Sequence, residues 1–475
     1  MADIIGRRSG RQTRNESAGP AMGGCIAGPA ASLCALLLAL PSAALANGYE
    51  DLHQSAQGLG TAYAVNGAGI TDISAMFSNP ASLSRFEGSW ASMGASAILP
   101  RDSFDDLHAT APYSGAPVTG TPAVPKQFLS HTVGASFFLS HQLSKTLVLG
   151  AAFTVPWATR STYPATAVSR YTAIDTNLRA YNFNPVLSWS AGNGISIAAG
   201  PTFQLYTADF STAVDPTGGI AASASNDIIS RIKARDFSVG VIVGAEWQLS
   251  PATRIGISYR SGVAHNFDGT LNLTSGNPNS IAMLDAGLFA ATGKHLSGPT
   301  GRARFKINTP SLATFGITHA VTPDFDLYGS ATLVGWHLFR DTLVSYDNGL
   351  PTTIVDNDWH DSWYVAIGAG YRMNEKVQLR TGIAYDWTPT PHSVRNPRAP
   401  NADRIYAGVG LTYQTSPLWK LDVAYNHCFF KDAPIDLAGG NNVPRGTLHG
   451  ISRIDANIFM AQFTVNIGQL LGRKR

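Results

Sequence analysis

Charge is scarce in this sequence. Asp, Glu, Lys and Arg make up 14% of its 475 residues, whereas about 25% is typical of soluble globular domains. The formal net charge of +3 is too small to suggest a strongly basic surface for a nucleic acid. No stretch beyond residue 46 reaches the roughly 18 consecutive apolar residues of a spanning helix. Nucleic-acid binding and helical membrane spans are therefore not expected.

Cysteine and catalytic motifs are also scarce. Of the three cysteines, Cys25 and Cys34 lie within the N-terminal 46 residues, and only Cys428 follows them. If the first 46 residues are removed as an export signal, Cys428 has no second cysteine with which to form an intramolecular disulfide. We interpret Cys428 as a small apolar residue. The sequence contains no G-x-S-x-G, no H-E-x-x-H and no cysteine or histidine cluster with metal-ligand spacing. We expect no enzyme activity, no metal and no other cofactor.

The N-terminus has the layout of an export signal. Four arginines between positions 7 and 14 precede an apolar run at 33–45, which ends in Ala44-Leu45-Ala46. This pattern predicts a secretory signal at 1–46 and a mature start at Asn47. The predicted cleavage removes four basic and two acidic residues and leaves a net charge of about +1. Export, low charge and abundant glycine and aromatic residues favour an outer-membrane β-barrel.

The rest of the chain alternates between strand-like segments and two kinds of connection. We predict fourteen strands, an even number as in bacterial single-chain barrels, at 89–98, 128–141, 146–157, 177–190, 194–207, 236–249, 253–266, 302–320, 324–336, 361–373, 376–387, 403–415, 418–430 and 456–468. Short turns, as at 144–145 and 374–375, alternate with long loops, as at 208–235 and 267–301. This alternation predicts an antiparallel transmembrane barrel at 89–468, followed by a basic tail at 469–475.

Individual strands alternate between apolar and polar faces. In the segment 376–387, Leu379 and Ile383 share one face, and Arg380 and Asp386 share the other. Lipid should contact the first face and the lumen the second. Aromatic residues near the strand ends suit interfacial girdles, and we assign to them Trp189, Tyr259, Trp336, Trp363, Tyr385 and Trp387.

Residues 47–88 do not have a strand pattern. Their four closely placed glycines, at 58, 60, 67 and 69, would interrupt a β-ladder. Thr71 or Asp72 could cap one short helix, and Asn79 could cap a second that begins with Pro80. A barrel of fourteen strands has a lumen to fill, unlike one of about eight. We predict that 47–88 forms a hatch inside the lumen.

The hatch and several later segments resemble FadL-type outer-membrane transporters of long-chain fatty acids. The similarity rests on SAQGLGTAYAVNGAG and DISAMFSNPASL in the hatch region, and extends through TVPWATRSTYP, LRAYNFNPVLSW, RIGISYRSGVAHNFDGTL and LRTGIAYDWTPTPHSVRNPRAPNADRIYAGVGLTYQ. These motifs follow one another in family order from about the mature start to the last strand. The chain departs from barrels that end on an aromatic residue, because it continues with GQLLGRKR.

The resemblance implies passive uptake of a long-chain fatty acid or a similar hydrophobic molecule, with exit sideways into outer-membrane lipid. The resemblance implies four sites. Asn79, Pro80 and Ala81 would form a hatch latch, and Pro156 would lie at a lateral exit in the third strand. A capture groove on the loop 267–301, near Lys294, would contain Ile281, Met283, Leu284, Leu288 and Phe289, and the lumenal partners of a carboxylate would be Arg404 and Arg380. Proline has no amide donor, which itself predicts a break in the third strand.

Each assignment has a simpler alternative. The apolar loop residues could pack only with one another, Pro156 could mark the end of its strand, and the arginines could pair with Asp386, Asp403 or Asp422 as wall scaffolding. Some relatives of the FadL family import aromatic hydrocarbons such as toluene. The sequence therefore leaves open whether the substrate is a fatty acid or an aromatic hydrocarbon. An outer-membrane lipid hydrolase and a structural or adhesive barrel are further alternatives. We expect a monomer.

Overall fold

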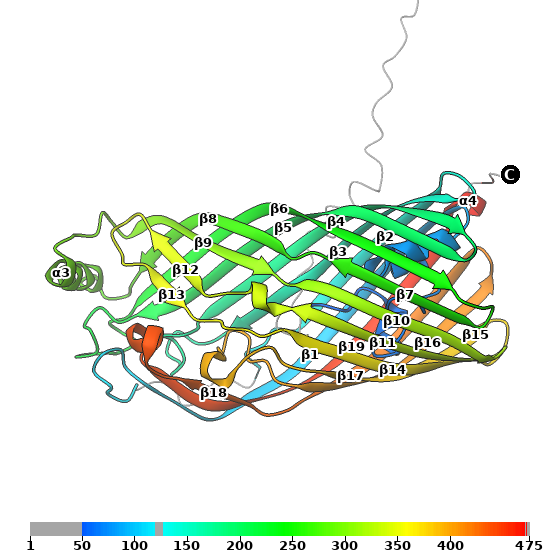
Figure 1. The fold of residues 1–475 in the computed structure, drawn as a ribbon. Helices are drawn as coiled ribbons and strands as arrows, with labels where there is room; N and C mark the ends of the chain where they lie inside the picture. Colours follow the sequence, from blue (N-terminus) through cyan, green and yellow to red (C-terminus); the bar gives the residue numbers. More distant parts are fainter. Residues whose placement is uncertain (1–49, 119–126, 471, 473–475) are drawn as a thin grey trace, which may run out of the picture. The chain divides into compact units, whose positions relative to one another are not determined.

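The computed structural model describes residues 50–118, 127–470 and 472. The predicted signal at 1–46 and most of the predicted tail at 469–475 therefore lie outside the described residues. The antiparallel strands form one closed barrel, because β1 pairs with β2 on one side and with β19 on the other (Figure 1).

Fourteen spans make the wall, as predicted. Their bounds are β1 Ser89–Thr110, β2 Thr132–Gln142, β3 Leu147–Thr162, β4 Asp175–Gly192, β5 Ile195–Val214, β6 Ile228–Gln248, β7 Thr253–Arg260 with β8 Val263–Thr274, β9 Thr300–Thr309 with β10 Ser311–Thr322, β11 Phe325–Gly335, β14 Ser362–Arg372, β15 Val377–Asp386, β16 Arg404–Ser416, β17 Trp419–Phe430 and β19 Thr447–Asn466. Two spans are interrupted, one at 261–262 and the other at Pro310, which has no amide to donate.

Several strands continue past their predicted ends. The connection expected at 208–235 is reduced to 215–227, and the one at 267–301 is reduced to 275–299. The expectation was wrong there because the extended strand ends carry polar side chains, such as Arg231 and Asp268, on the outward face, and their apolar side chains, such as Phe267, face inward. A strand needs an apolar outward face only where it contacts lipid.

The long connections contain short elements. These are α3 Ser280–Thr292, η3 Trp336–Leu338, β12 Thr342–Tyr346, β13 Thr353–Val355, η4 His392–Val394, β18 Ala433–Leu437 and η5 Gly440–Arg445, and α4 Ile467–Leu470 follows the last strand. None of the helices in the described ranges is long and apolar enough to cross a membrane.

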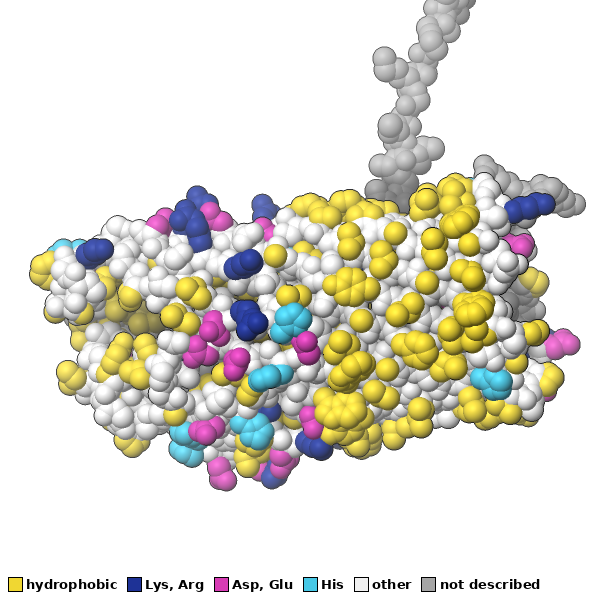
Figure 2. Space-filling model, in the orientation of Figure 1, with side chains coloured by type: hydrophobic (Ala, Val, Ile, Leu, Met, Phe, Trp, Pro, Cys, Tyr) yellow, Lys and Arg dark blue, Asp and Glu magenta, His cyan; other side chains and the backbone are white. Residues whose placement is uncertain are grey.

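Side chains alternate across the wall as predicted. On β15, Leu379 and Ile383 are 38% and 49% exposed on the outer face, whereas Arg380 is buried. Figure 2 shows hydrophobic side chains over the half of the barrel that carries the short turns, and charged side chains beyond them. One girdle assignment was wrong: Trp336 is fully buried just after β11, because it shares the inward parity of Tyr328 and Val334 on that strand.

The hatch, at 50–88, contains α2 Ala56–Gly60, η1 Ile73–Phe77 and η2 Pro80–Arg85. Asp72 caps η1 by accepting the Ser74 amide at 2.8 Å, and Asn79 caps η2 by accepting the Ala81 amide at 3.1 Å. The hatch is held inside the wall by side chains that reach its backbone. Tyr364 donates to the Ala62 carbonyl at 2.9 Å, for example.

A row of inward-facing glycines lets the hatch backbone lie directly against the wall. We call these residues the glycine track: Gly244, Gly256, Gly316, Gly368, Gly382, Gly408 and Gly410. A Cβ atom at Gly382 would overlap the Thr61 carbonyl, and one at Gly316 would overlap the Asn66 carbonyl. Several track glycines pair across neighbouring strands, as Gly382 does with Gly368 and Gly408. Small size is therefore needed at these positions for close approach.

We predict that Gly382→Val displaces the hatch from the track, since the added methyl groups have no space against Thr61. Overpacking of this kind costs about 1–3 kcal/mol, and a dislodged hatch should raise ion conductance through the barrel in planar bilayers. Gly329→Val is the matched control, because a Cβ there meets Ile317 Cγ2 only, at 3.3 Å. Equal conductance of the two variants would contradict the role of the track.

Candidate functional site

The hydrogen-bond ladder between β2 and β3 is incomplete. It runs from the pair Gln142–Val148 to the pair Phe137–Phe153 and ends there. Residues 132–136 of β2 pair with β1 but, among the described strands, have no partner on β3. Contact resumes further along, where the Thr162 amide donates to the Phe128 carbonyl at 2.9 Å. The wall thus contains one bounded opening in its β2–β3 ladder.

Pro156 lies at this opening. On the other side of β3, the register with β4 shifts between Thr154 and Trp157, so that Val155 and Pro156 together oppose a single residue, Tyr181. This is a β-bulge, which bends its strand. Pro156 does not end β3, which continues to Thr162, so the simpler alternative of a strand terminus is wrong.

The first residues of the hatch supply the polar partners that the opening lacks. The Asp51 amide donates to the Pro156 carbonyl at 2.6 Å, and Gln54 Nε2 donates to the Val155 carbonyl at 3.3 Å. From β2, Ser136 Oγ donates to the Gln54 carbonyl at 3.0 Å. Residues 50–54 therefore bridge both edges of the opening from inside the lumen, and we call them the bridging segment.

An apolar cluster lines the lumen between the long connections and the opening. Its largest members are Trp157, Tyr206, Phe267, Phe305, Trp336, Phe339 and Trp359. Trp157 and Trp336 meet edge to face with centroids 5.9 Å apart, and Trp336 and Trp359 are 4.7 Å apart. Because Trp157 follows Pro156 directly, this lumenal apolar cluster begins at the bulge of β3. This cluster was not predicted from the sequence, although inward parity at Tyr206, Phe267 and Phe305 was a usable signal.

The helix α3 contains all five residues expected in the capture groove. Ile281 and Leu284 pack against the lumenal apolar cluster and Leu288 is buried, whereas Met283 and Phe289 are 39% and 48% exposed. The loop is anchored to its neighbour 215–227, since Ser280 Oγ donates to the Asn226 carbonyl at 2.6 Å. The helix thus presents apolar side chains both to the cluster and to the outside.

The end of α3 is fixed by an acidic side chain. Asp285 accepts the Leu296 amide at 2.6 Å and contacts His295 Nδ1 at 2.9 Å. The hydrogen bond from the Leu296 amide, and then the one from His295, lower the pKa of Asp285 below its ordinary value. The His295 ring also stacks on Phe289 at 4.3 Å. The segment after α3 is therefore folded back onto the helix, and Lys294 follows its left-handed cap at Gly293.

Asn79, Pro80 and Ala81 sit where the hatch meets β6. The buried Asn79 amide donates to the Gly67 carbonyl at 2.8 Å and to the Ala245 carbonyl at 3.0 Å. It therefore joins two parts of the hatch to the wall while it caps η2. A Cβ at Gly244 would overlap the Asn79 side chain, so this contact also belongs to the glycine track.

Arg404 and Arg380 are both inward and buried, but they differ in their partners. Arg404 Nε donates to Asp386 at 2.9 Å, and its two terminal nitrogens have no hydrogen-bond partner among the described residues. The guanidinium lies 4.9 Å from the ring centroid of Phe430. Arg380, in contrast, donates to Thr412 and to Gln378 Oε1 and lies 3.5 Å from Asp422. Of these two arginines, Arg404 retains donors for a ligand. Arg380 fits the alternative in which an arginine pairs with an aspartate as scaffolding of the wall.

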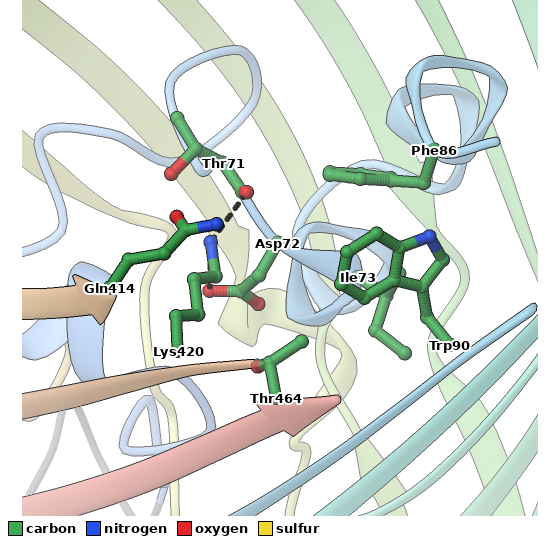
Figure 3. Close-up of a pocket in the computed structure, with 8 residues that line it drawn as sticks. All are labelled: Thr71, Asp72, Ile73, Phe86, Trp90, Gln414, Lys420 and Thr464. Carbon is green, nitrogen blue, oxygen red and sulfur yellow. Dashed lines mark hydrogen bonds and ion pairs between the residues drawn. The ribbon is translucent and has the colours of Figure 1, made fainter. Parts of the chain in front are cut away.

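A cavity of about 150 Å³ separates the hatch from the wall near the short turns (Figure 3). Its lining consists of Thr71, Asp72, Ile73 and Phe86 of the hatch and Trp90, Gln414, Lys420 and Thr464 of the wall. Lys420 Nζ donates to the Thr71 carbonyl at 2.6 Å and lies 3.9 Å from Asp72. A second cavity, between Glu50 and Arg260, measures only about 30 Å³, which is room for about one water.

A family model described as "Outer membrane protein transport protein (OMPP1/FadL/TodX)" matches residues 37–467. The chain belongs to this family. Its members are transport proteins and not enzymes, so this chain is an outer-membrane β-barrel transporter of hydrophobic compounds.

Relatives in the FadL/TodX family are similar along most of their length. A protein of Neisseria meningitidis assigned to the outer membrane is 27% identical, with 88% of this chain and 94% of that protein covered. The long-chain fatty acid transport protein of Escherichia coli O6:H1 is also 27% identical, with 80% and 86% covered.

Solved structures of the FadL/TodX family have the same fold. A FadL homologue from Pseudomonas aeruginosa superposes with a TM-score of 0.79 at 23% identity, covering 88% of this chain and 99% of that one. The toluene transporter TodX of Pseudomonas putida gives a TM-score of 0.60 at 15% identity, with 88% and 99% covered.

Proposed function

We propose that this protein takes up long-chain fatty acids, or acids of similar chemistry, without an energy source. The observation that carries this proposal is the lumenal apolar cluster, which reaches from α3 to Trp157 beside the β2–β3 opening. Each buried methylene favours apolar surroundings by about 0.8 kcal/mol, so a chain of ~16 carbons carries on the order of 10 kcal/mol. A watery pore would be a barrier to such a molecule, whereas apolar contacts would guide it.

Capture begins at α3. Its exposed Met283 and Phe289 offer the first apolar surface, and Ile281 and Leu284 connect it to the cluster inside. The ligand then moves along the aromatic side chains toward Trp157. A hydrocarbon chain follows such a surface by exchanging one apolar contact for another, so no step requires it to enter water.

Exit takes place sideways through the β2–β3 opening. The bridging segment must leave first, because it occupies the lumenal side of the opening. The rest of the hatch stays in place, since the glycine track and Asn79 hold residues 59–67 and 79 against the wall. A ligand that binds the state with the displaced segment more tightly would shift the hatch toward it.

Arg404 favours an acid over an uncharged hydrocarbon. Its terminal nitrogens are buried donors without hydrogen-bond partners in the described residues, and a carboxylate can accept from both. The E. coli relative named as a long-chain fatty acid transport protein supports the same choice. The second candidate is an aromatic hydrocarbon, which is favoured by the fold shared with a toluene transporter and by the aromatic lining of the lumen.

Deletion of Pro156 tests the exit. With one residue fewer between Thr154 and Trp157, β3 would oppose β4 one to one and could pair with β2. We expect uptake of a labelled C16 fatty acid by cells to fall about tenfold or more, because a closed ladder leaves no lateral path. Pro156→Ala keeps the extra residue and should retain most uptake. Normal uptake by the deletion variant would contradict lateral exit at this position.

The variant Leu284→Ser/Phe289→Ser tests capture at α3. Loss of two apolar side chains should lower uptake at low ligand concentration by about fivefold or more, with little change at saturation. Ala282→Ser/Ala290→Ser places two serines on the same helix without removing a large side chain and serves as the control. If both variants take up ligand equally well, these residues only pack the loop.

The double variant Arg404→Gln/Asp386→Asn tests the ligand class, because it removes the charged pair without leaving one buried charge alone. Loss of a charge-assisted hydrogen bond of at least about 1.5 kcal/mol should weaken palmitate binding about tenfold, while toluene binding should be unchanged. Arg380→Gln/Asp422→Asn is the matched control. Uptake of toluene but not palmitate by the unmodified protein would select the second candidate.

A further inference from the structure

The outer wall carries a concentrated group of cations beyond its lipid-facing band. Along β6, Arg231, Lys233 and Arg235 are exposed on the outer face, at every second position. Along β9, Arg302, Arg304 and Lys306 are exposed in the same way. The strand β8 lies between β6 and β9 and pairs with both. We call these six side chains the outer cationic patch, and Figure 2 shows Lys and Arg side chains gathered over this part of the barrel.

The carboxylates nearby only partly neutralise the patch. Asp209 pairs with Arg231 at 2.8 Å, and Asp268 pairs with Arg302 at 2.6 Å. Each also has a second cation nearby, Lys233 at 3.8 Å and Arg304 at 3.3 Å. Arg235 and Lys306 form no ion pair with a described residue. Asp347 also accepts the Arg302 amide at 2.6 Å, and the charge of Asp175 acts on Arg231. Six cations thus face four carboxylates, which leaves an excess of positive charge on one sector of the wall.

The position of the patch along the barrel identifies what it would meet. The outer face of β6 continues from Arg235 directly into Phe237, Val239 and Val241, which are 61%, 54% and 50% exposed. Arg235 and Phe237 are two residues, about 7 Å, apart along the strand. The patch lies toward the long connections, which face the cell exterior in such barrels. It therefore begins where the acyl chains of the outer leaflet end and the headgroups start.

The opposite sector shows that this charge is not a general property of the wall. On the neighbouring strands β1 and β19, Arg453 contacts Asp105 at 2.8 Å and Asp432 at 3.5 Å, and Arg101 is paired across the ladder with Asp455. Two cations face three carboxylates there. The cationic excess therefore distinguishes the β6–β8–β9 sector from the β1–β19 sector.

We propose that the outer cationic patch binds the phosphate groups of a phosphorylated outer-leaflet glycolipid of the lipid A type. Guanidinium groups bind phosphate oxygens through paired hydrogen bonds, and the lysine ammonium groups add point charges. Two phosphates on one headgroup match a patch that spreads over β6 and β9. The bound lipid would hold this sector of the barrel at a fixed height in the membrane.

The experiment measures binding of bis-phosphorylated lipid A to the purified full-length protein in detergent micelles, by native mass spectrometry across a range of lipid concentrations. Each cation near an anionic lipid contributes about fivefold in affinity, so Arg235→Gln/Lys306→Gln should weaken binding about 25-fold. Arg101→Gln/Arg453→Gln removes two cations from the β1–β19 sector, where carboxylates outnumber them, and should change the affinity less than about twofold. Binding by the unmodified protein should weaken as salt is raised.

Three results would overturn the proposal. One is equal binding of lipid A by the patch variant and the control, and another is undiminished binding of lipid A whose phosphates have been removed. The third is a patch variant that binds lipid A normally but loses uptake of anionic ligands, which would mean that the patch steers substrate instead. Inorganic pyrophosphate should not compete at matched concentration if the lipid is the partner. Heat-modifiable migration checks folding, and Arg231→Gln/Arg302→Gln replaces the patch variant if it fails to fold.

Discussion

In a bilayer, every backbone amide and carbonyl of a spanning segment must find a partner within the protein, because hydrocarbon offers none. This barrel satisfies most of that constraint through the ladders between neighbouring strands, and the described ladder between β2 and β3 ends at Phe137 and Phe153. There the bridging segment of the hatch supplies the missing partners to Val155 and Pro156. The hatch is thus part of the wall's hydrogen bonding as well as a filling for the lumen. On the proposed route, the same contacts that complete the wall are those that a ligand must replace.

The glycine track explains how so short a hatch can stay in place. Its contacts with the wall are close and involve backbone, so they leave no space for adjustment at Thr61 or Asn66. The bridging segment has no comparable row of glycines beside it and is held by the antiparallel bridge between Glu50 and Trp157 and by hydrogen bonds from Asp51, Gln54 and Ser136. A few hydrogen bonds of roughly 1 kcal/mol each can be exchanged more readily than a close-packed backbone. The hatch therefore divides into a part fixed on the wall and a part suited to movement.

Much of this arrangement could be predicted from the sequence, because period-two alternation survives wherever one face meets lipid. The strand 376–387 gave the correct faces for Leu379 and Arg380, and the caps at Asp72 and Asn79 followed from local backbone chemistry. Strand ends on the exterior side were not located, since their outward face is polar and their apolar side chains, such as Phe267 and Leu271, face inward. Trp336 was misplaced because the girdle assignment used only its position near a strand end, whereas its parity with Tyr328 and Val334 points it inward. Strand parity correctly predicted that Arg380 and Arg404 both face inward. It could not predict that Thr412 and Gln378 accept hydrogen bonds from Arg380.

The lumenal apolar cluster and the β2–β3 opening share one residue pair, Pro156-Trp157, and this adjacency has a physical consequence. The bulge that turns Pro156 out of register also changes the parity of β3, so that Val155, Pro156 and Trp157 are all buried in succession. Regular alternation would have pointed every second side chain to lipid. One extra residue thus interrupts the ladder and at the same time places a large aromatic ring on the lumenal side of the interruption. On the proposed route, an opening without such a ring would present bare backbone to the hydrophobic ligand, and a ring without the opening would bind the ligand without giving it a path to the membrane.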